Sequence, residues 1–262
     1  MGRAIGVLSL KGGVGKTSVV VALGDAIAGF GKKVLLIDGN LTAPNLGLHF
    51  NILNPDSTLH ELLDRSANIK DAVIKLDKFD IIPAALFSRK NVSPLKLKEK
   101  VRYLKKKYDY ILIDSAPSLD EESLSVVLAA DELLVVVTPD HLSLASSLKA
   151  IKRANQRGTR INGLILNKVY KKKFELSIKD VEKTTDVPVL AVIPHDVKFV
   201  KALSQFKSYI SSKPRSKGAK EYKKLAGVLV GEKYKPRKAS KYFITPNRQE
   251  INREVFYKQV FK

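Results

Sequence analysis

Ten residues near the start of the chain have the residue types that bind nucleotide phosphates. Residues 9–18 read Ser-Leu-Lys-Gly-Gly-Val-Gly-Lys-Thr-Ser. Glycines allow successive backbone N–H groups to turn inward around phosphate oxygens, and a lysine and a hydroxyl after them hold the β/γ-phosphates and magnesium. The segment therefore predicts a site for ATP and Mg²⁺. Its expected binding residues are Gly12, Gly13, Val14, Gly15, Lys16, Thr17 and Ser18.

Two features of this loop depart from the general phosphate-loop pattern. That pattern has a glycine five residues before Gly15, where this chain has Leu10. The loop also carries a second lysine, Lys11, which an ordinary phosphate loop does not require. A glycine-rich turn without chemical meaning is the simpler alternative. It would not account for Lys16 and Thr17 at the required spacing, after a strand-like segment and at the start of a helical one.

The surrounding chain alternates short apolar runs with longer stretches of helical periodicity, which predicts βαβ units. Several runs are apolar without alternation, as in strands covered on both faces. The predicted strands are 4–10, 33–38, 80–83, 110–114, 133–138, 161–167 and 189–193. The predicted helices are 16–29, 58–65, 94–106, 120–130, 143–156, 177–184, 196–206 and 216–230. We expect an α/β fold of P-loop NTPase type over 1–231, a single doubly wound, mostly parallel sheet with helices on both faces. A basic extension, 232–262, follows it.

Composition narrows the class of protein. The chain has no cysteine, which excludes disulfides, thiolate metal sites and cysteine nucleophiles. The net charge of +21 favours association with a polyanion, either nucleic acid or an anionic membrane surface. A lysine-rich, solvated surface without a partner is the alternative. No apolar run reaches the length of a membrane span and no signal-peptide pattern is present, so we expect a cytoplasmic protein, associated with the nucleoid or a membrane surface.

Two segments concentrate the basic residues. Residues 89–107 carry nine lysines and arginines against one acid, and residues 233–262 carry nine against two. We expect both segments to bind DNA without sequence preference, the second with help from the aromatic residues Tyr242, Phe243, Phe256 and Tyr257. In the first segment we expect Leu95, Val101 and Leu104 to face the core, which leaves the basic side chains outward. The alternatives are a solvated helix face without a partner for the first segment and a fold-back onto the domain for the second.

The motifs, taken in order, resemble those of one ATPase family. Residues 11–17 are similar to the deviant Walker A motif of the ParA/MinD ATPases, in which the position of Leu10 varies. The resemblance runs over residues 3–230 and is closest to archaeal MinD-like proteins. It includes the segments Val34–Asp38, Asn40–Leu46, Tyr110–Ser118, Gly163–Val169 and Ile193–Asp196.

The resemblance implies roles for individual residues. Lys11 would be the signature lysine, which reaches across an ATP-bound homodimer to phosphates held by the other subunit. Lys16 would hold the β/γ-phosphates, and Thr17 and Asp114 would serve Mg²⁺, Asp114 as the Walker B carboxylate. Asn167 and the turn from Pro194 to Asp196 would frame the adenine, although Asn167 alone reads as a strand-end turn residue.

One position departs from the family pattern. The family commonly has Asp-x-Asp after the second strand, and this chain has Asp38-Gly39-Asn40. An amide oxygen accepts a hydrogen bond from water but cannot take up its proton as a carboxylate can. We therefore expect slow hydrolysis, with Asp38 or an activating partner protein as the alternative source of the missing function.

Three functions remain open at this point. The first is a ParA-like ATPase that organises cargo, division or segregation on DNA, and the second is a MinD-like ATPase on a membrane. The apolar residues of 251–261 spread around a helical projection, so they predict no clean membrane-binding stripe. The third is a nucleotide-gated binding module with little or no hydrolysis, which Asn40 keeps open.

Overall fold

The computed structural model describes residues 1–88, 92–118, 120–232 and 247–261 and contains one eight-stranded sheet. The strand order is β3-β4-β2-β5-β1-β6-β7-β8, and every pair is parallel except β3 with β4. The strands are β1 (Arg3–Leu8), β2 (Val34–Asp38), β3 (Ile74–Lys75), β4 (Asp80–Ile82), β5 (Tyr110–Asp114), β6 (Glu132–Val137), β7 (Arg160–Val169) and β8 (Val189–Pro194). The mostly parallel sheet expected from the sequence is confirmed.

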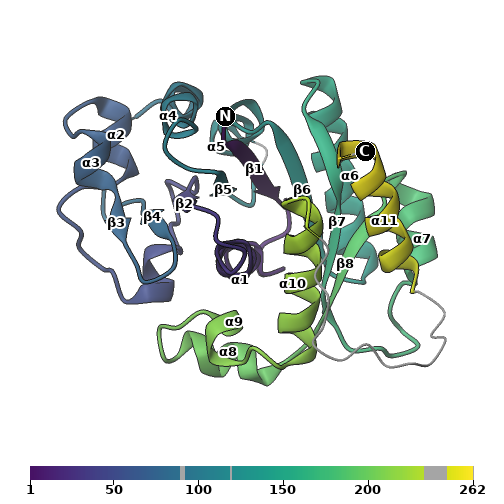
Figure 1. The fold of residues 1–262 in the computed structure, drawn as a ribbon. Helices are drawn as coiled ribbons and strands as arrows, with labels where there is room; N and C mark the ends of the chain where they lie inside the picture. The colour runs from purple at the N-terminus through teal and green to yellow at the C-terminus, as the bar shows by residue number, and fades with distance from the viewer. Residues whose placement is uncertain (89–91, 119, 233–246, 262) are drawn as a thin grey trace.

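Helices cover both faces of this sheet (Figure 1). They are α1 (Lys16–Ala28), α2 (Leu59–Asp64), α3 (Ile69–Ala72), α4 (Leu97–Leu104), α5 (Glu121–Ala129), α6 (His141–Gln156), α7 (Ile178–Thr185), α8 (Val197–Leu203), α9 (Tyr209–Ser212), α10 (Lys217–Leu229) and α11 (Arg248–Phe261). Short 3₁₀ helices occupy Gly47–Phe50 and Pro94–Lys96.

The two faces divide the side chains of each strand in alternation. In β1, Ile5 and Val7 pack under α1 and α10, whereas Ala4 and Leu8 belong to the core beneath α2, α4, α5 and α6. A strand buried on both faces is apolar at every position, because successive side chains point to opposite sides. This explains the uninterrupted apolar runs of the sequence.

The helix α11 packs against β8 and α10 (Figure 1). Phe256 is 3% exposed within the core beneath α10, and the guanidinium of Arg253 bonds Glu221 at 2.8 Å. Residues 248–261 of the basic extension therefore fold back onto the domain, which is the alternative that the sequence analysis gave for this segment. Tyr242 and Phe243 lie outside the described residues.

The expectation for segment 94–106 needs one correction. The prediction that Leu95 faces the core is wrong, since Leu95 is 42% exposed in the 3₁₀ turn. The α-helix begins at Leu97, so Leu97, Val101 and Leu104 share one buried face at spacings of four and three residues. The sequence also missed β3, α3 and α9, which have two to four residues and are too short to show a periodicity.

Candidate functional site

The phosphate-binding loop joins the carboxyl end of β1 to the first residue of α1. Gly13 and Gly15 adopt φ values of 76° and 94°, in the left-handed region that favours glycine. A Cβ built on Gly12 or Gly13 would meet no atom within 4 Å, whereas one on Gly15 would lie 2.6 Å from Asn167 Nδ2. The loop is therefore open on its outer side and tightly packed behind, as a cradle for an anion at a helix N-terminus requires.

Oxygen ligands suited to a divalent cation lie beside the start of α1. The hydroxyl of Thr17 donates to Asp114 Oδ2 at 2.5 Å, and Asp114 is 1% exposed at the end of β5. Asp114 Oδ1 is buried and accepts no hydrogen bond from the described residues. Burial raises the pKa of Asp114, against the opposing effects of Thr17 and Lys16. A buried carboxylate with a free oxygen next to a hydroxyl fits Mg²⁺, a hard cation that prefers such ligands.

The two candidate lysines of the loop have different surroundings. Lys16 is 8% exposed, and burial lowers the pKa of its amine while the charge of Asp114 opposes that change. Its buried position at the start of α1 suits a lysine that neutralises phosphates bound in the same loop.

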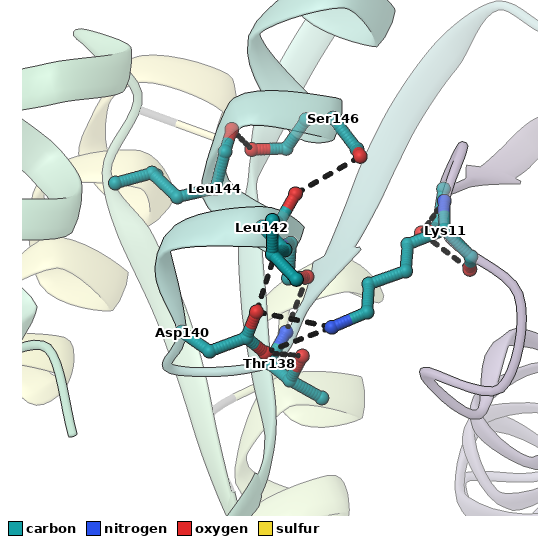
Figure 2. Close-up of polar contacts among 9 residues, drawn as sticks. Lys11, Thr138, Asp140, Leu142, Leu144 and Ser146 are labelled. Atoms are coloured by element: carbon teal, nitrogen blue, oxygen red, sulfur yellow. Dashed lines mark hydrogen bonds and ion pairs between the residues drawn. The ribbon is translucent and has the colours of Figure 1, made fainter. Parts of the chain in front are cut away.

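Lys11 points away from that cradle. Figure 2 shows its side chain extending from the loop to the carboxylate of Asp140, which caps the N-terminus of α6. The amine lies 3.0 Å and 3.2 Å from the two carboxylate oxygens, and Lys11 is 35% exposed. Burial by itself would raise the pKa of Asp140, but hydrogen bonds from Thr138, Ser143 and Lys11 together lower it.

Asp38 organises the loop that follows β2. It is fully buried next to Asp114, its register partner on β5, and it accepts backbone N–H groups of Asn40, Asn45 and Leu46 at 3.3, 3.0 and 2.8 Å. Burial, followed by the neighbouring charge of Asp114, raises the pKa of Asp38. Its contacts within the protein are those of a residue that holds the loop in place.

The side chain of Asn40 is bonded within the same loop. Its Nδ2 donates to the carbonyl of Ala43 at 2.5 Å, and its Oδ1 accepts the N–H of Ala43 at 3.2 Å. An aspartate could accept the second bond but could not donate the first. Asn40 therefore closes a turn with both ends of its amide.

A second buried carboxylate reaches this loop from α5. Glu122 is 8% exposed and accepts the N–H groups of Leu41 and Thr42, at 2.9 and 3.3 Å, and the hydroxyl of Thr42, at 2.5 Å. Because α5 follows the strand that carries Asp114, Glu122 ties the loop after β2 to the segment after β5.

The residues expected around adenine are only partly brought together. Asn167 donates to the carbonyl of Val14 at 2.7 Å and so joins the end of β7 to the phosphate loop. Pro194 ends the neighbouring strand β8. Asp196 caps α8 and accepts the hydroxyl of Tyr209 at 2.7 Å, so its carboxylate is bonded within its own segment.

Sequence reasoning missed three residues of this region: Glu122, Asp140 and Lys168. Lys168 donates to the carbonyl of Gly13 at 2.7 Å. The cap of α6 was the available signal for Asp140, since a helix start favours aspartate. Nothing local connects any of the three with its partner, because the partners lie 80 to 155 residues away in sequence.

Taken together, the strand–loop–helix cradle, the buried lysine and the hydroxyl paired with a buried carboxylate define a P-loop nucleotide-binding protein. A family model described as an AAA domain matches residues 2–166. An uncharacterised ATP-binding protein of Methanocaldococcus jannaschii is 34% identical over 237 residues, which cover 89% of this chain and 90% of that protein. The septum site-determining protein MinD of Bacillus subtilis is 28% identical over 245 residues, 88% of this chain and 90% of that protein.

A solved structure also matches the chain over most of its length. The septum site-determining protein MinD of Pyrococcus horikoshii, complexed with Mg-ADP, superposes with a TM-score of 0.83 at 34% identity, over 87% of this chain and 96% of the other. The chain belongs to the ParA/MinD family of P-loop ATPases. ATP and Mg²⁺ are its cofactors, and the residues around Gly13, Lys16, Thr17 and Asp114 fit both. No helix in the described part of the chain is long and apolar enough to cross a membrane.

Proposed function

We propose that this protein is an ATP-dependent dimerising switch that positions cargo, division machinery or DNA inside the cell. The observation that carries the proposal is the different placement of the two loop lysines. Lys16 lies in the cradle of its own loop, whereas Lys11 stands outside it in a half-exposed ion pair with Asp140. An ion pair of this exposure is weak. Lys11 is thus available to a nucleotide bound by a second copy of the chain.

The cellular role follows from the relatives and from charge. Related proteins carry the names septum site-determining protein MinD and sporulation initiation inhibitor protein Soj. The present chain has a net charge of +21, and α4 with the turn after it carries exposed Lys98, Arg102, Lys106 and Lys107. We therefore assign it a cytoplasmic role on the nucleoid, through non-specific contacts with DNA phosphates.

The described part of the basic extension supports this role less than α4 does. Arg248 pairs with Glu182 at 2.8 Å, Arg253 is buried against Glu221, and Lys258 lies 3.8 Å from Glu254. Phe256 is buried, so it cannot stack on a base or insert into a lipid bilayer while α11 is docked. We place the main DNA contacts in 89–107 for this reason.

Slow hydrolysis is part of the proposal. The amide of Asn40 is engaged with Ala43, and Asp38 is bonded to three backbone N–H groups. Neither side chain is free to activate water in this arrangement. If the turn persists with ATP bound, the protein would stay in its ATP state until a partner protein rearranges the loop.

The first experiment measures binding of the full chain to duplex DNA and to anionic liposomes, each with and without Mg-ATP. ATP-dependent DNA binding that weakens steeply with salt is the expected result. Liposome binding without DNA binding would favour the membrane-associated alternative. Lys11→Ala is the matched variant, because it should still bind ATP through Lys16 but lose ATP-dependent dimerisation. Dimerisation that persists in Lys11→Ala would contradict the proposal.

The second experiment addresses turnover. Single-turnover hydrolysis of ATP is compared for the native chain, Asn40→Asp and Asn40→Ala. We expect Asn40→Asp to hydrolyse faster, because a carboxylate can accept the proton of the attacking water. An unchanged or slower rate would contradict the role given to Asn40. Tight ATP binding without detectable turnover, with DNA present, would favour the binding-module alternative.

A further inference from the structure

The outer surface of α4 presents one exposed aromatic ring among basic side chains. Tyr103 is 49% exposed, and the amine of Lys107 lies 5.1 Å from the centroid of its ring. Arg102 and Lys106 are exposed beside it, and Lys100 is half-buried one turn earlier. Leu97, Val101 and Leu104 fill the opposite face of the helix, so the ring of Tyr103 is not needed for the core.

Two hollows meet at Tyr103. One, of about 570 Å³, lies between α4 and the segment of α2 and α3, with Arg65, Lys70, Lys100 and Lys107 on its walls. The other, of about 290 Å³, has Arg102 and Lys106 on its walls. Ile69, Lys100 and Tyr103 line both, and we call the combined feature the Tyr103 groove. The larger hollow falls in the size range of sites that hold small ligands, about 300–1,000 Å³.

The charges of the Tyr103 groove are poorly compensated. Six cations face two acids, Asp71 and Glu99. Asp71 already accepts the N–H of Asn68, and Glu99 makes an exposed 3.6 Å pair with Arg65, which is weak. The other five make no ion pair with any described residue; they are Lys70, Lys100, Arg102, Lys106 and Lys107. Cations held this close repel one another, and an anionic ligand would relieve that repulsion.

The combination of an exposed ring and flanking cations matches one class of ligand. Unpaired bases stack on aromatic side chains while lysines and arginines contact the phosphates between them. In a duplex the bases are already stacked on one another, so a duplex would use the cations but not the ring. We propose that the Tyr103 groove binds single-stranded nucleic acid. This deepens the proposed DNA association, on which it rests for its cellular setting, and gives it a surface and a preferred strand form.

The position of the groove separates it from the nucleotide site. In Figure 1, α2, α3 and α4 lie at one end of the sheet, and α6, α7 and α11 lie at the other. None of the groove residues lies in the phosphate loop or in the loop 38–46. Binding of single-stranded nucleic acid in the groove therefore does not require ATP, whereas dimerisation in the proposed switch does.

The test measures fluorescence anisotropy of a labelled 20-residue oligothymidylate and of a mixed-sequence duplex of the same length, with the full chain. Tyr103→Ala should weaken oligothymidylate binding about 5- to 150-fold, the range of one lost base stack. It should leave duplex binding within about twofold, and Tyr103→Phe, which keeps the ring, should bind the oligothymidylate like the native chain. The double change Lys100→Glu and Lys107→Glu should weaken both ligands and reduce the salt dependence.

The matched control is Lys149→Glu with Lys152→Glu, two exposed lysines of α6 at the other end of the molecule. This control should bind the oligothymidylate more tightly than the groove double variant does. Native-like oligothymidylate binding by Tyr103→Ala, or equal weakening of both ligands, would overturn the proposal. Oligothymidylate binding that no groove variant weakens, together with ATP-dependent duplex binding, would overturn it while leaving the proposed function intact. Tyr103-dependent strand binding without ATP-dependent duplex binding would support the groove and count against the proposed function.

Discussion

Replacement of Asp140 by asparagine should free Lys11 without removing the cap of α6. Asparagine caps helices about as well as aspartate. Its oxygen can still accept the N–H of Ser143, which lies 2.8 Å from the Asp140 carboxylate in the native chain. What is lost is the charge that holds the lysine. The side chains of Lys11 and Asp140 are 35% and 42% exposed, and pairs of this exposure contribute about 0.2–1 kcal/mol.

In the proposed dimer each subunit presents its Lys11 to the other, so this pair must break twice. Breaking both pairs costs about 0.4–2 kcal/mol per dimer, and Asp140→Asn avoids this cost. The variant should therefore dimerise about 2- to 30-fold more tightly in the presence of ATP. Sedimentation velocity over a series of protein concentrations, with Mg²⁺ and a non-hydrolysable ATP analogue, measures this constant. The difference from the native chain should shrink at high salt, because salt screens exposed charges.

A matched control exists on the same chain. Asp131 pairs with Lys105 at 2.6 Å, is 45% exposed and accepts the backbone N–H of Ala4, so Asp131→Asn removes a similar charge away from the loop. This control should dimerise like the native chain. Equal or weaker dimerisation of Asp140→Asn would refute the reasoning that Asp140 restrains Lys11.

Three further predictions concern stability. Glu122→Ala should lower the free energy of unfolding in urea by about 1–3 kcal/mol, because it leaves the buried N–H of Leu41 unpaired, whereas exposed Glu121→Ala should change it little. The raised pKa of Asp38 means that its contribution is fully present below the ordinary aspartate value of about 4 and is lost as the pH rises through the folded-state value. Without nucleotide and Mg²⁺, thermal unfolding temperatures of the native chain should therefore fall from pH 5 to pH 9 more than those of Asp38→Asn; parallel curves would contradict this. Phe256→Ala should cost about 3–5 kcal/mol and speed hydrogen exchange in 248–261, and half-exposed Val255→Ala, the control, should do neither.

The sheet and the phosphate loop could be predicted because their signals are local. The strand Tyr110–Asp114 matches its prediction at both ends, since an apolar run bounded by polar residues is visible in the sequence itself. The loop from Gly12 to Thr17 is equally local. The pairing of Lys11 with Asp140 is not, because the two residues are 129 positions apart and only the order of β1 and β6 in the sheet brings them together.

The helix α11 shows a different limit of prediction from sequence. Its apolar residues spread around the helical projection, so apolar periodicity predicts no single buried face for it. The structure docks it through Phe256 and also through polar contacts, among them the pairs of Arg253 with Glu221 and of Lys224 with Glu250. A count of apolar positions cannot register a face that is held by ion pairs to another helix.

The same helix has a consequence for the solubility of the protein. β8 is the last strand of the sheet, and an open strand edge invites pairing with other chains. Asn252 donates to the carbonyl of Val189 and Arg253 to that of Leu190, each at 2.8 Å, so side chains of α11 bond to the backbone of this edge strand. Removal of residues 232–262 would therefore uncover an aggregation-prone edge, which makes point substitutions the safer way to study this part of the chain.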